Sequence, residues 1–199
     1  GGNNVIRKVD RSGIISTVVT GLSSPLSINV GRDGELFIVE SDGKNQITKI
    51  DNNNLKNSVT ITRTSEVLPS VSDFHLPESA PLAFVSSVAV LSDTELIVAD
   101  TYNHMIKKVE LNTKTFSSLT PTTLSYPRGA IIVNNEVYFA DYGNHCIRKV
   151  DSNGVMHVVA GVCGSGGFSG DYGQANSAQL FYPSSVAVAS NGDMFIADS

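Results

Sequence analysis

The sequence predicts an all-β fold, a β-propeller with four visible four-stranded blades. A strand-like segment, ELFIVES at 35–41, returns as ELIVADT at 95–101, EVYFADY at 136–142 and DMFIADS at 193–199. Self-similarity at a period of about 40 to 60 residues indicates a repeat architecture, and four short antiparallel strands per repeat form a propeller blade. Leu96, Ile97 and Val98 place apolar side chains on both faces of one such strand. Neighbouring blades are therefore expected to cover each blade on both sides.

The other strands of each repeat follow in a fixed order. First strands precede the segment above: PLSINV, VSSVAV, PRGAIIV and PSSVAV, which begin at residues 25, 85, 127 and 183. Third strands follow it: ITKID at 47–51, IKKVE at 106–110 and IRKVD at 147–151, with VIRKVD at 5–10 as a further copy. Fourth strands are IISTVV at 14–19 and VMHVVA at 155–160. Turn residues such as Gly31 to Gly34, Asn134-Asn135 and Asn191-Gly192 separate the strands and favour tight hairpins.

The repeat lengths alternate. The acidic residue that ends the third strand recurs at intervals of 41, 59 and 41 residues, from Asp10 to Asp151. The longer repeats contain the connections 62–81 and 162–179, and the segments 79–90 and 177–188 share eight of twelve residues. These features predict a duplicated two-blade unit of about 100 residues. One propeller region then spans 1–199, with blades at approximately 22–80, 81–123, 124–179 and 1–21, the last completed by 180–199.

The repeat motifs resemble those of the NHL-repeat family. The resemblance rests on P-x-x-V-A-V, on a second strand ending in Ala-Asp, on GNHCIRKVD at 143–151, and on the glycine-rich segment 164–180. The second blade departs from this pattern, with Val39-Glu40 in place of Ala-Asp. The resemblance implies a ring of six blades, of which four are visible here.

The two ends of the sequence read as halves of one motif. FIADS at 195–199 stops where a second strand stops, and GGNNVIRKVD at 1–10 begins where a third strand begins. Three explanations remain open: strand exchange that closes the ring, a segment of a longer array, or an interface for head-to-tail assembly. An unpaired sheet edge favours pairing with a partner in each case.

Repeated acidic and histidine side chains are the candidates for metal chemistry. Glu40, Asp100, Asp141 and Asp198 occupy equivalent positions, as do His104 and His145. A carboxylate ring is a calcium hypothesis, and a lyase with an NHL-like propeller uses zinc, so Asp100, Asp141, His104 and His145 would be the metal ligands of an enzyme. We favour the structural interpretation, in which the acids accept backbone N–H bonds at the following turn and the histidines shape it. No cofactor is then expected.

The charge balance argues against nucleic acid. The formal net charge is −5, and phosphate binding requires a basic field. Basic residues recur on the third strands at Arg7, Lys8, Lys49, Lys107, Lys108, Arg148 and Lys149. Because acidic residues accompany them around the ring, RNA binding is only the second alternative. No apolar run reaches the ~18 residues of a membrane span, so no membrane insertion is expected.

The two cysteines, Cys146 and Cys163, are predicted to be free. If 151–154 forms the hairpin turn, Cys146 lies opposite about Val159, and Cys163 is roughly 13 Å further along the strand. A disulfide requires Cα atoms within about 7 Å. The prediction would fail if the chain bulges or folds back after Gly161.

The long connections are the predicted contact surface. Phe74 and His75 in one, and Phe168 and Tyr172 in the other, are the candidate partner-binding residues, because surface loops on a rigid scaffold carry most contacts. The glycine-rich run 164–170 lacks the Lys-Ser/Thr of a phosphate loop and is interpreted as a flexible connector.

These observations predict a non-catalytic binding or scaffold module. It would dock a protein or a glycan through its rim loops, or assemble with copies of itself through blade edges, within a larger extracellular or surface protein. The alternative is a metal-dependent propeller hydrolase or lyase with calcium or zinc. No nucleophile paired with a base and no paired carboxylates support an enzyme, so we expect that the chain is not one.

Overall fold

The computed structural model confirms the all-β prediction. It describes residues 3–41, 46–51, 54–61, 82–121 and 123–199. These residues contain no α-helix, and the strands form antiparallel sheets of two or four strands. Phe74, His75 and the connection 62–81 lie outside the described residues.

Three consecutive four-stranded sheets form the body of the described structure. The first contains β3 (Pro25–Val30), β4 (Leu36–Glu40), β5 (Gln46–Asp51) and β6 (Asn54–Ile61). The second contains β7 (Val85–Val90), β8 (Glu95–Asp100), β9 (Met105–Glu110) and β10 (Thr115–Ser118). The third contains β11 (Pro127–Val133), β12 (Glu136–Asp141), β13 (Cys146–Val150) and β14 (Met156–Ala160). Each is an up-and-down blade in chain order, as the repeat predicts.

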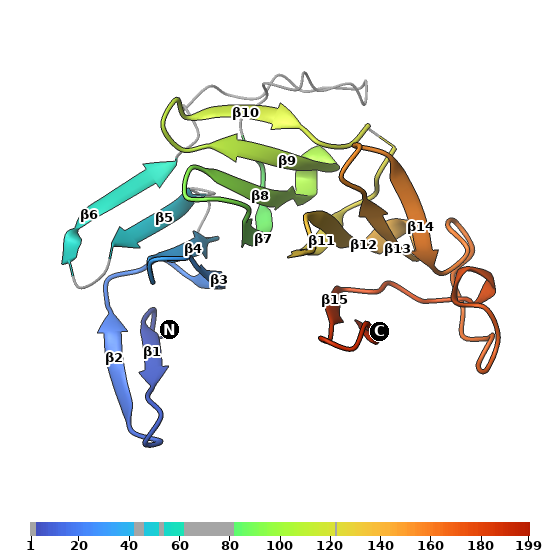
Figure 1. Ribbon diagram of the computed structural model, residues 1–199, viewed down its shortest axis with the longest axis horizontal. Helices are drawn as coiled ribbons and strands as arrows, with labels where there is room; N and C mark the ends of the chain where they lie inside the picture. Colours follow the sequence, from blue (N-terminus) through green and yellow to red (C-terminus); the bar gives the residue numbers. More distant parts are fainter. Residues whose placement is uncertain (1–2, 42–45, 52–53, 62–81, 122) are drawn as a thin grey trace.

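The sheets follow one another around an arc. In Figure 1 the first strands β3, β7 and β11 line the concave side and the fourth strands β6, β10 and β14 lie outside. Neighbouring first strands contact each other, β3 with β7 and β7 with β11. We call these first strands, together with β15, the inner strands.

Two-stranded sheets stand at the ends of the arc. They are β1 (Ile6–Val9) with β2 (Ile15–Val19), and β15 (Ser185–Val188) with β16 (Met194–Ala197). The structure shows them as separate sheets, on opposite sides of the opening of the arc (Figure 1). Completion of one blade by 1–21 and 180–199 therefore stays a prediction.

The hydrophobic core lies between the blades. Leu96 and Val98 of β8 pack with Phe37 of the preceding sheet, whereas Ile97 and Ala99 pack with Phe139 of the following sheet. All six side chains are buried. One strand thus contributes alternate residues to two cores, which explains why its sequence is apolar without alternation.

The predicted hairpins form where the turn residues indicated. Asn134 and Asn135, between β11 and β12, have φ values of 51° and 63°, the left-handed pair that a two-residue type I′ turn requires. Gly192, with φ 91°, turns the chain between β15 and β16. Asparagine and glycine tolerate these conformations better than other residues, so they fix the register of the strands.

Candidate functional site

The repeated acidic residues fasten each blade to its own entry segment. Each accepts a backbone N–H from a residue 16 or 17 positions earlier, just before the inner strand, at 2.6–2.7 Å. The pairs are Glu40 with Ser23, Asp100 with Ala83, Asp141 with Ser125, and Asp198 with Phe181. The structural interpretation agrees with these bonds, but the expected partner was wrong. The backbone N–H comes from the preceding segment and not from the following turn, because the sheet brings the end of the second strand beside the start of the inner strand.

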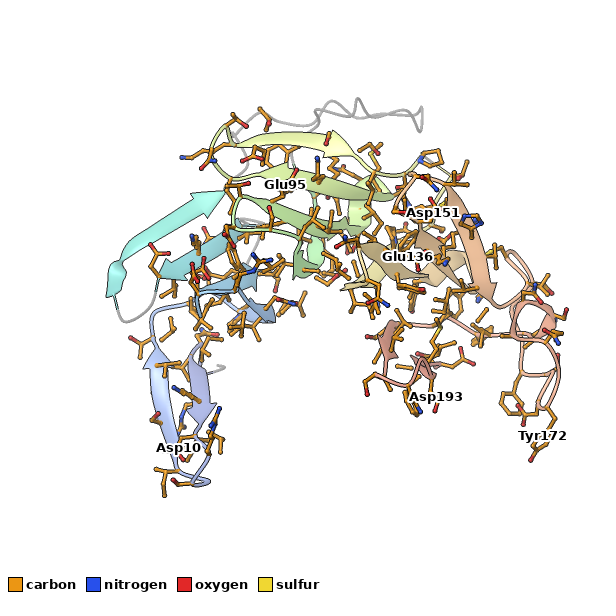
Figure 2. The ribbon with its side chains drawn as sticks, viewed as in Figure 1. Asp10, Glu95, Glu136, Asp151, Tyr172 and Asp193 are labelled. Atoms are coloured by element: carbon orange, nitrogen blue, oxygen red, sulfur yellow. A yellow bond between two sulfur atoms is a disulfide. The ribbon has the colours of Figure 1, made fainter. Side chains whose placement is uncertain are left out.

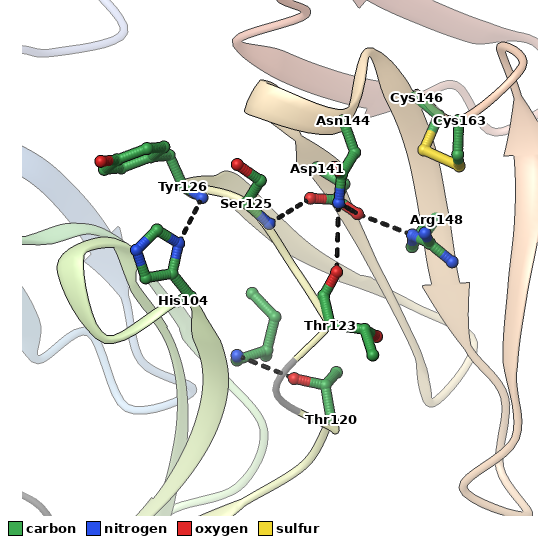
Figure 3. Close-up of polar contacts among 11 residues, drawn as sticks. His104, Thr120, Thr123, Ser125, Tyr126, Asp141, Asn144, Cys146, Arg148 and Cys163 are labelled. Atoms are coloured by element: carbon green, nitrogen blue, oxygen red, sulfur yellow. Dashed lines mark hydrogen bonds and ion pairs between the residues drawn. A yellow bond between two sulfur atoms is a disulfide. The ribbon is translucent and has the colours of Figure 1, made fainter. Parts of the chain in front are cut away.

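Side chains from the following turn and third strand complete the bonding of these acids. Asp141 accepts hydrogen bonds from Asn144 at 2.9 Å and from Arg148 at 2.8 Å (Figure 3). Asp100 accepts from Asn103 at 2.7 Å and forms an ion pair with Lys107 at 3.0 Å, with both charged side chains fully buried. Burial raises the pKa of Asp100, and the positive charge of Lys107 opposes that effect. These carboxylates therefore have hydrogen-bonding partners within the protein.

His104 and His145 hold the start of the next blade. Both residues have left-handed φ values, 57° and 59°, at the ends of the short 3₁₀ turns η1 (Thr101–Asn103) and η2 (Tyr142–Asn144). The Nδ1 of His104 accepts the backbone N–H of Tyr126 at 3.1 Å, as Figure 3 shows, and that of His145 accepts the N–H of Tyr182 at 3.0 Å. Each ring is therefore the tautomer with its proton on Nε2.

The metal hypothesis gains no ligand set from this geometry. Within the described residues, no group of three or more His, Cys, Asp or Glu side chains is placed to hold a metal ion. Asp100, Asp141, His104 and His145 each have the protein partners described above. Whether the protein takes a cofactor is not tested here, and the expectation of none stays a prediction.

Aromatic side chains gather where one blade meets the next. We call this group the aromatic shelf, and it contains Phe84, Tyr102, His104, Tyr126, Tyr142, His145, Phe181 and Tyr182. It comes from two repeated places, the turn after the second strand and the residues before the inner strand. Tyr102, Tyr126 and Phe181 are 57%, 43% and 46% exposed, so ring faces remain open to solvent.

Ring contacts join the shelf across blade boundaries. Tyr102 stacks on Phe84, with centroids 4.8 Å apart, and meets Tyr126 of the next blade edge-on at 6.1 Å. One blade further on, Tyr142 lies 5.0 Å from Tyr182. Offset and edge-on contacts of this kind are favourable geometries for aromatic pairs. The same arrangement therefore occurs twice, at consecutive boundaries.

A cavity of about 370 Å³ opens beside the shelf, among the inner strands. We call it the inner cavity. Phe84 lines it, together with the second and third residues of the repeated segments that begin at 25, 85, 127 and 183. These residues are Leu26, Ser86, Arg128 and Ser184, followed by Ser27, Ser87, Gly129 and Ser185. Its size is within the range of small-molecule sites, and most of its lining side chains are small and polar.

Gly129 allows the inner strands to approach closely at this cavity. Its φ is +57°, and a Cβ there would lie 2.8 Å from the Cα of Ser185 and 3.0 Å from the carbonyl oxygen of Ser184. The pairing of β11 with β12 is irregular between Arg128 and Ile131. The irregularity and the contact with β15 together set the direction of the neighbouring Arg128.

Arg128 is the charged side chain of the inner cavity. Its guanidinium carbon lies 3.9 Å from the centroid of the Tyr142 ring, a cation–π contact. Its Nε is buried and has no hydrogen-bond partner. Arg128 was not among the site residues predicted from the sequence. The sequence does mark it, because one of four equivalent positions holds arginine where the others hold leucine or serine.

The predicted rim-loop residues lie elsewhere. Phe168 is 85% exposed and Tyr172 is fully exposed, and Figure 2 shows Tyr172 at the outer edge of the molecule, away from the inner strands. The loop itself is not the flexible connector that we expected. Backbone bonds such as Gly164 N–H to the carbonyl of Asn144 hold it against its blade, and Gly166 packs on the ring of His145.

The cysteine prediction was wrong, because Cys146 and Cys163 form a disulfide with Cα atoms 5.1 Å apart. An irregularity between Ile147 and Arg148 shifts the register, so that Ala160 pairs with Ile147. Gly161 then turns the chain back with φ +83°, and a Cβ there would lie 2.6 Å from the carbonyl oxygen of His145. This is the fold-back after Gly161 on which the prediction depended. Figure 3 shows the bond beside β13.

Five of the seven recurrent basic residues of the third strands are paired with a carboxylate at short range. Lys108 pairs with Glu95 at 2.7 Å and Lys149 with Glu136 at 2.8 Å, while Lys107 and Arg148 bind the buried acids. Lys49 lies 3.4 Å from Glu35. Such pairs do not form the open basic field that RNA requires.

Among the described residues, no helix is long and apolar enough to cross a membrane.

Comparison with known proteins shows the β-propeller fold. No family model and no curated protein sequence matches the chain. An auxiliary nutrient-binding protein from Bacteroides thetaiotaomicron matches over 99% of this chain and 51% of its own, with TM-score 0.66 and 15% identity. A virginiamycin B lyase from Staphylococcus aureus matches over 98% and 57%, with TM-score 0.61 and 18% identity. A chain of the nidogen/laminin complex matches over 98% and 82%, with TM-score 0.64 and 13% identity.

These similarities correct one expectation and leave another as a prediction. The chain spans about half the length of the nutrient-binding protein and of the lyase. Membership of the NHL family stays a prediction, since the neighbours establish the propeller alone. The expectation that the chain is not an enzyme is corrected, because structures with the same fold include virginiamycin B and streptogramin B lyases. The fold thus provides no ground for separating this chain from enzymes.

Replacing both cysteines, as Cys146→Ser with Cys163→Ser, should lower the free energy of unfolding by about 3 kcal/mol, because the bond closes a loop of this size in the unfolded chain. The separation of the two residues is 17. Urea unfolding measures the loss. A reducing agent should cause a similar loss in the wild type and none in the double variant. Equal stability of the oxidised wild type and the variant would contradict the bond.

His104 should make stability depend on pH. Burial lowers the pKa of His104, although the charges of Asp141 and Asp100 act in the opposite direction. The unfolded chain then binds a proton more readily than the folded one, so the contribution is complete above about pH 6.5 and disappears as pH falls through the lower folded pKa. The stability difference between wild type and His104→Gln should therefore shrink from pH 7.5 to pH 5. Urea unfolding at both values measures it, and a constant difference would refute the role.

Proposed function

We propose that this chain is a glycan-binding module of an NHL-type propeller, whose binding surface is the aromatic shelf with the adjoining inner cavity. The observation that carries the proposal is the placement of partly exposed rings at two consecutive blade boundaries, next to a cavity whose lining includes Phe84, five serines and Arg128. Tyr102 and Tyr126 offer open ring faces at one blade boundary, and Phe181 and Tyr182 do so at the next. Surfaces of this kind combine stacking with a few polar groups that orient the ligand.

The chemistry of the lining favours a sugar over a broad protein surface. Serine hydroxyls both donate and accept hydrogen bonds, as sugar hydroxyls do. Ser184 and Ser185 line the cavity beside the ring of Phe84. A cavity volume of about 370 Å³ suits one end of a small polar chain. Protein partners instead usually bury a broad surface, about 800 Å² per side.

Two further observations support this setting. The nutrient-binding protein from Bacteroides thetaiotaomicron shares the fold, so the propeller is suited to presenting a binding site. The disulfide between Cys146 and Cys163 is a feature of oxidising compartments. Both agree with a module of an extracellular or surface protein.

Binding should depend on the shelf and not on the rim loop. After a glycan array has identified a retained oligosaccharide, Tyr102→Ala should weaken its binding about fivefold, since an anchoring ring contributes about 1 kcal/mol or more. Tyr172→Ala is the matched control in the rim loop and should leave the affinity unchanged. The chain has 6 tyrosines and no tryptophan, so tyrosine fluorescence can report the titration. An array that retains no glycan, or equal effects of both variants, would contradict the proposal.

A second candidate function is assembly through the ends of the arc. Val9, Ile15 and Val30 are exposed near one end and Phe195 near the other. Exposed apolar side chains on strands favour packing against a further blade, whether from the same protein or from a second copy.

Assembly predicts a sedimentation mass at a multiple of 21.1 kDa when the chain is tens of micromolar. Phe195→Asp should reduce the mass to that of one chain, because a carboxylate cannot be buried in an apolar contact without a partner. A single-chain mass for the wild type throughout the concentration series would exclude this candidate.

A further inference from the structure

We infer that Arg128 binds a carboxylate of the ligand, so that the inner cavity selects acidic glycans such as uronates and sialosides. The inference rests on the proposed glycan-binding function and assigns its specificity to one side chain. Three features of Arg128 support the inference: its position in the repeat, the absence of a hydrogen-bond partner for its Nε, and its contact with Tyr142.

Arg128 stands at a position where the fold does not need a charge. The equivalent residues of the other inner strands are Leu26, Ser86 and Ser184, and all four line the cavity. The sheets that contain β3 and β7 have the same four-stranded order with an apolar or a hydroxyl side chain at this place. The repeat therefore explains the strand but not the guanidinium, which makes a role in binding the better explanation.

The guanidinium has no anion of its own among the described residues. Its buried Nε makes no hydrogen bond, and the carboxylates of the described part of the chain form their ion pairs with other cations. Arg148 and Lys107, by contrast, are each paired with a buried aspartate. A buried donor without a partner destabilises the protein, so an anion that fills this place gains a charge-assisted bond and removes that cost.

The surroundings orient Arg128 for a flat, two-oxygen anion. Its guanidinium carbon lies 3.9 Å from the centroid of the Tyr142 ring, so the cation–π contact holds the group beside the aromatic shelf. A guanidinium carries its N–H donors in a planar fork that matches the two oxygens of a carboxylate. The cavity lining contains no Asp or Glu that would repel an anion. Because Tyr142 also contacts Tyr182, the arginine continues the shelf, and a sugar that stacks there can present its carboxylate to it.

The test compares acidic glycans with neutral counterparts of the same skeleton. The probes are trigalacturonate with its methyl ester, and sialyllactose with its methyl ester, titrated into the whole chain and followed by tyrosine fluorescence. At least one acidic member should bind about tenfold or more tightly than its neutral counterpart, equivalent to ~1.4 kcal/mol. Arg128→Gln should abolish the preference, so that the acidic member and its neutral counterpart bind with equal affinity. Arg128→Lys should keep part of the preference, since lysine retains the charge but not the two-bond geometry.

Arg7→Gln is the control, because Arg7 is an exposed arginine on β1, outside the cavity. It should leave the preference intact, and urea unfolding verifies that each variant is folded. Neutral members that bind as tightly as acidic ones, or a preference that survives Arg128→Gln, would overturn the inference and leave glycan binding standing. If no probe binds and a glycan array is also empty, the proposed function fails together with the inference.

Discussion

A carboxylate at the end of each second strand, buried at Glu40, Asp100 and Asp141, holds the blades of this propeller in shape. It accepts a backbone N–H from the segment that enters the same blade, as Asp141 does from Ser125 and Asp100 does from Ala83. That bond fixes where the inner strand begins, and therefore where the aromatic residue before it and the cavity residues after it are placed. The low polarity of the surroundings makes the bond costly to break, because an unpaired buried carboxylate has no alternative partner. The shelf and the cavity both depend on this constraint.

The residue proposed to select the ligand, Arg128, lies where the repeat is imperfect. The strands, hairpins and buried acids recur from blade to blade because stacking requires the same solution each time. Arg128 departs from that scheme, whereas rings of the shelf recur at two consecutive blade boundaries. Nutrient-binding proteins and lyases share the fold with this chain, so the fold alone does not decide the chemistry.

The fold could be predicted from the sequence because its signals are local and repeated. Strand pattern, Asn-Asn and Asn-Gly turns, and apolar residues on both faces of β8 all indicate stacked blades, and the structure agrees. The site could not be predicted in the same way. Residues up to about 40 positions apart come into contact in the shelf, such as Tyr142 and Tyr182. The bulge after Ile147 that brings Cys163 to Cys146 leaves no mark in the spacing of the strands. Arg128 was visible only as a deviation between equivalent positions, and its meaning required the burial of its Nε and its contact with Tyr142.

The residue that precedes each inner strand has a left-handed backbone although it is never glycine. Ser24, Phe84, Tyr126 and Tyr182 have φ values between 49° and 51°. Neighbouring backbone groups bond this stretch in ways that do not involve the side chain, such as the N–H of Thr101 to the carbonyl of Phe84 and the N–H of Ser41 to that of Ser24. The conformation is thus separated from the identity of the side chain, and serine, phenylalanine and tyrosine all occur there. Each blade consequently provides one exchangeable contact, and a ligand preference can diversify blade by blade while the propeller beneath it stays the same.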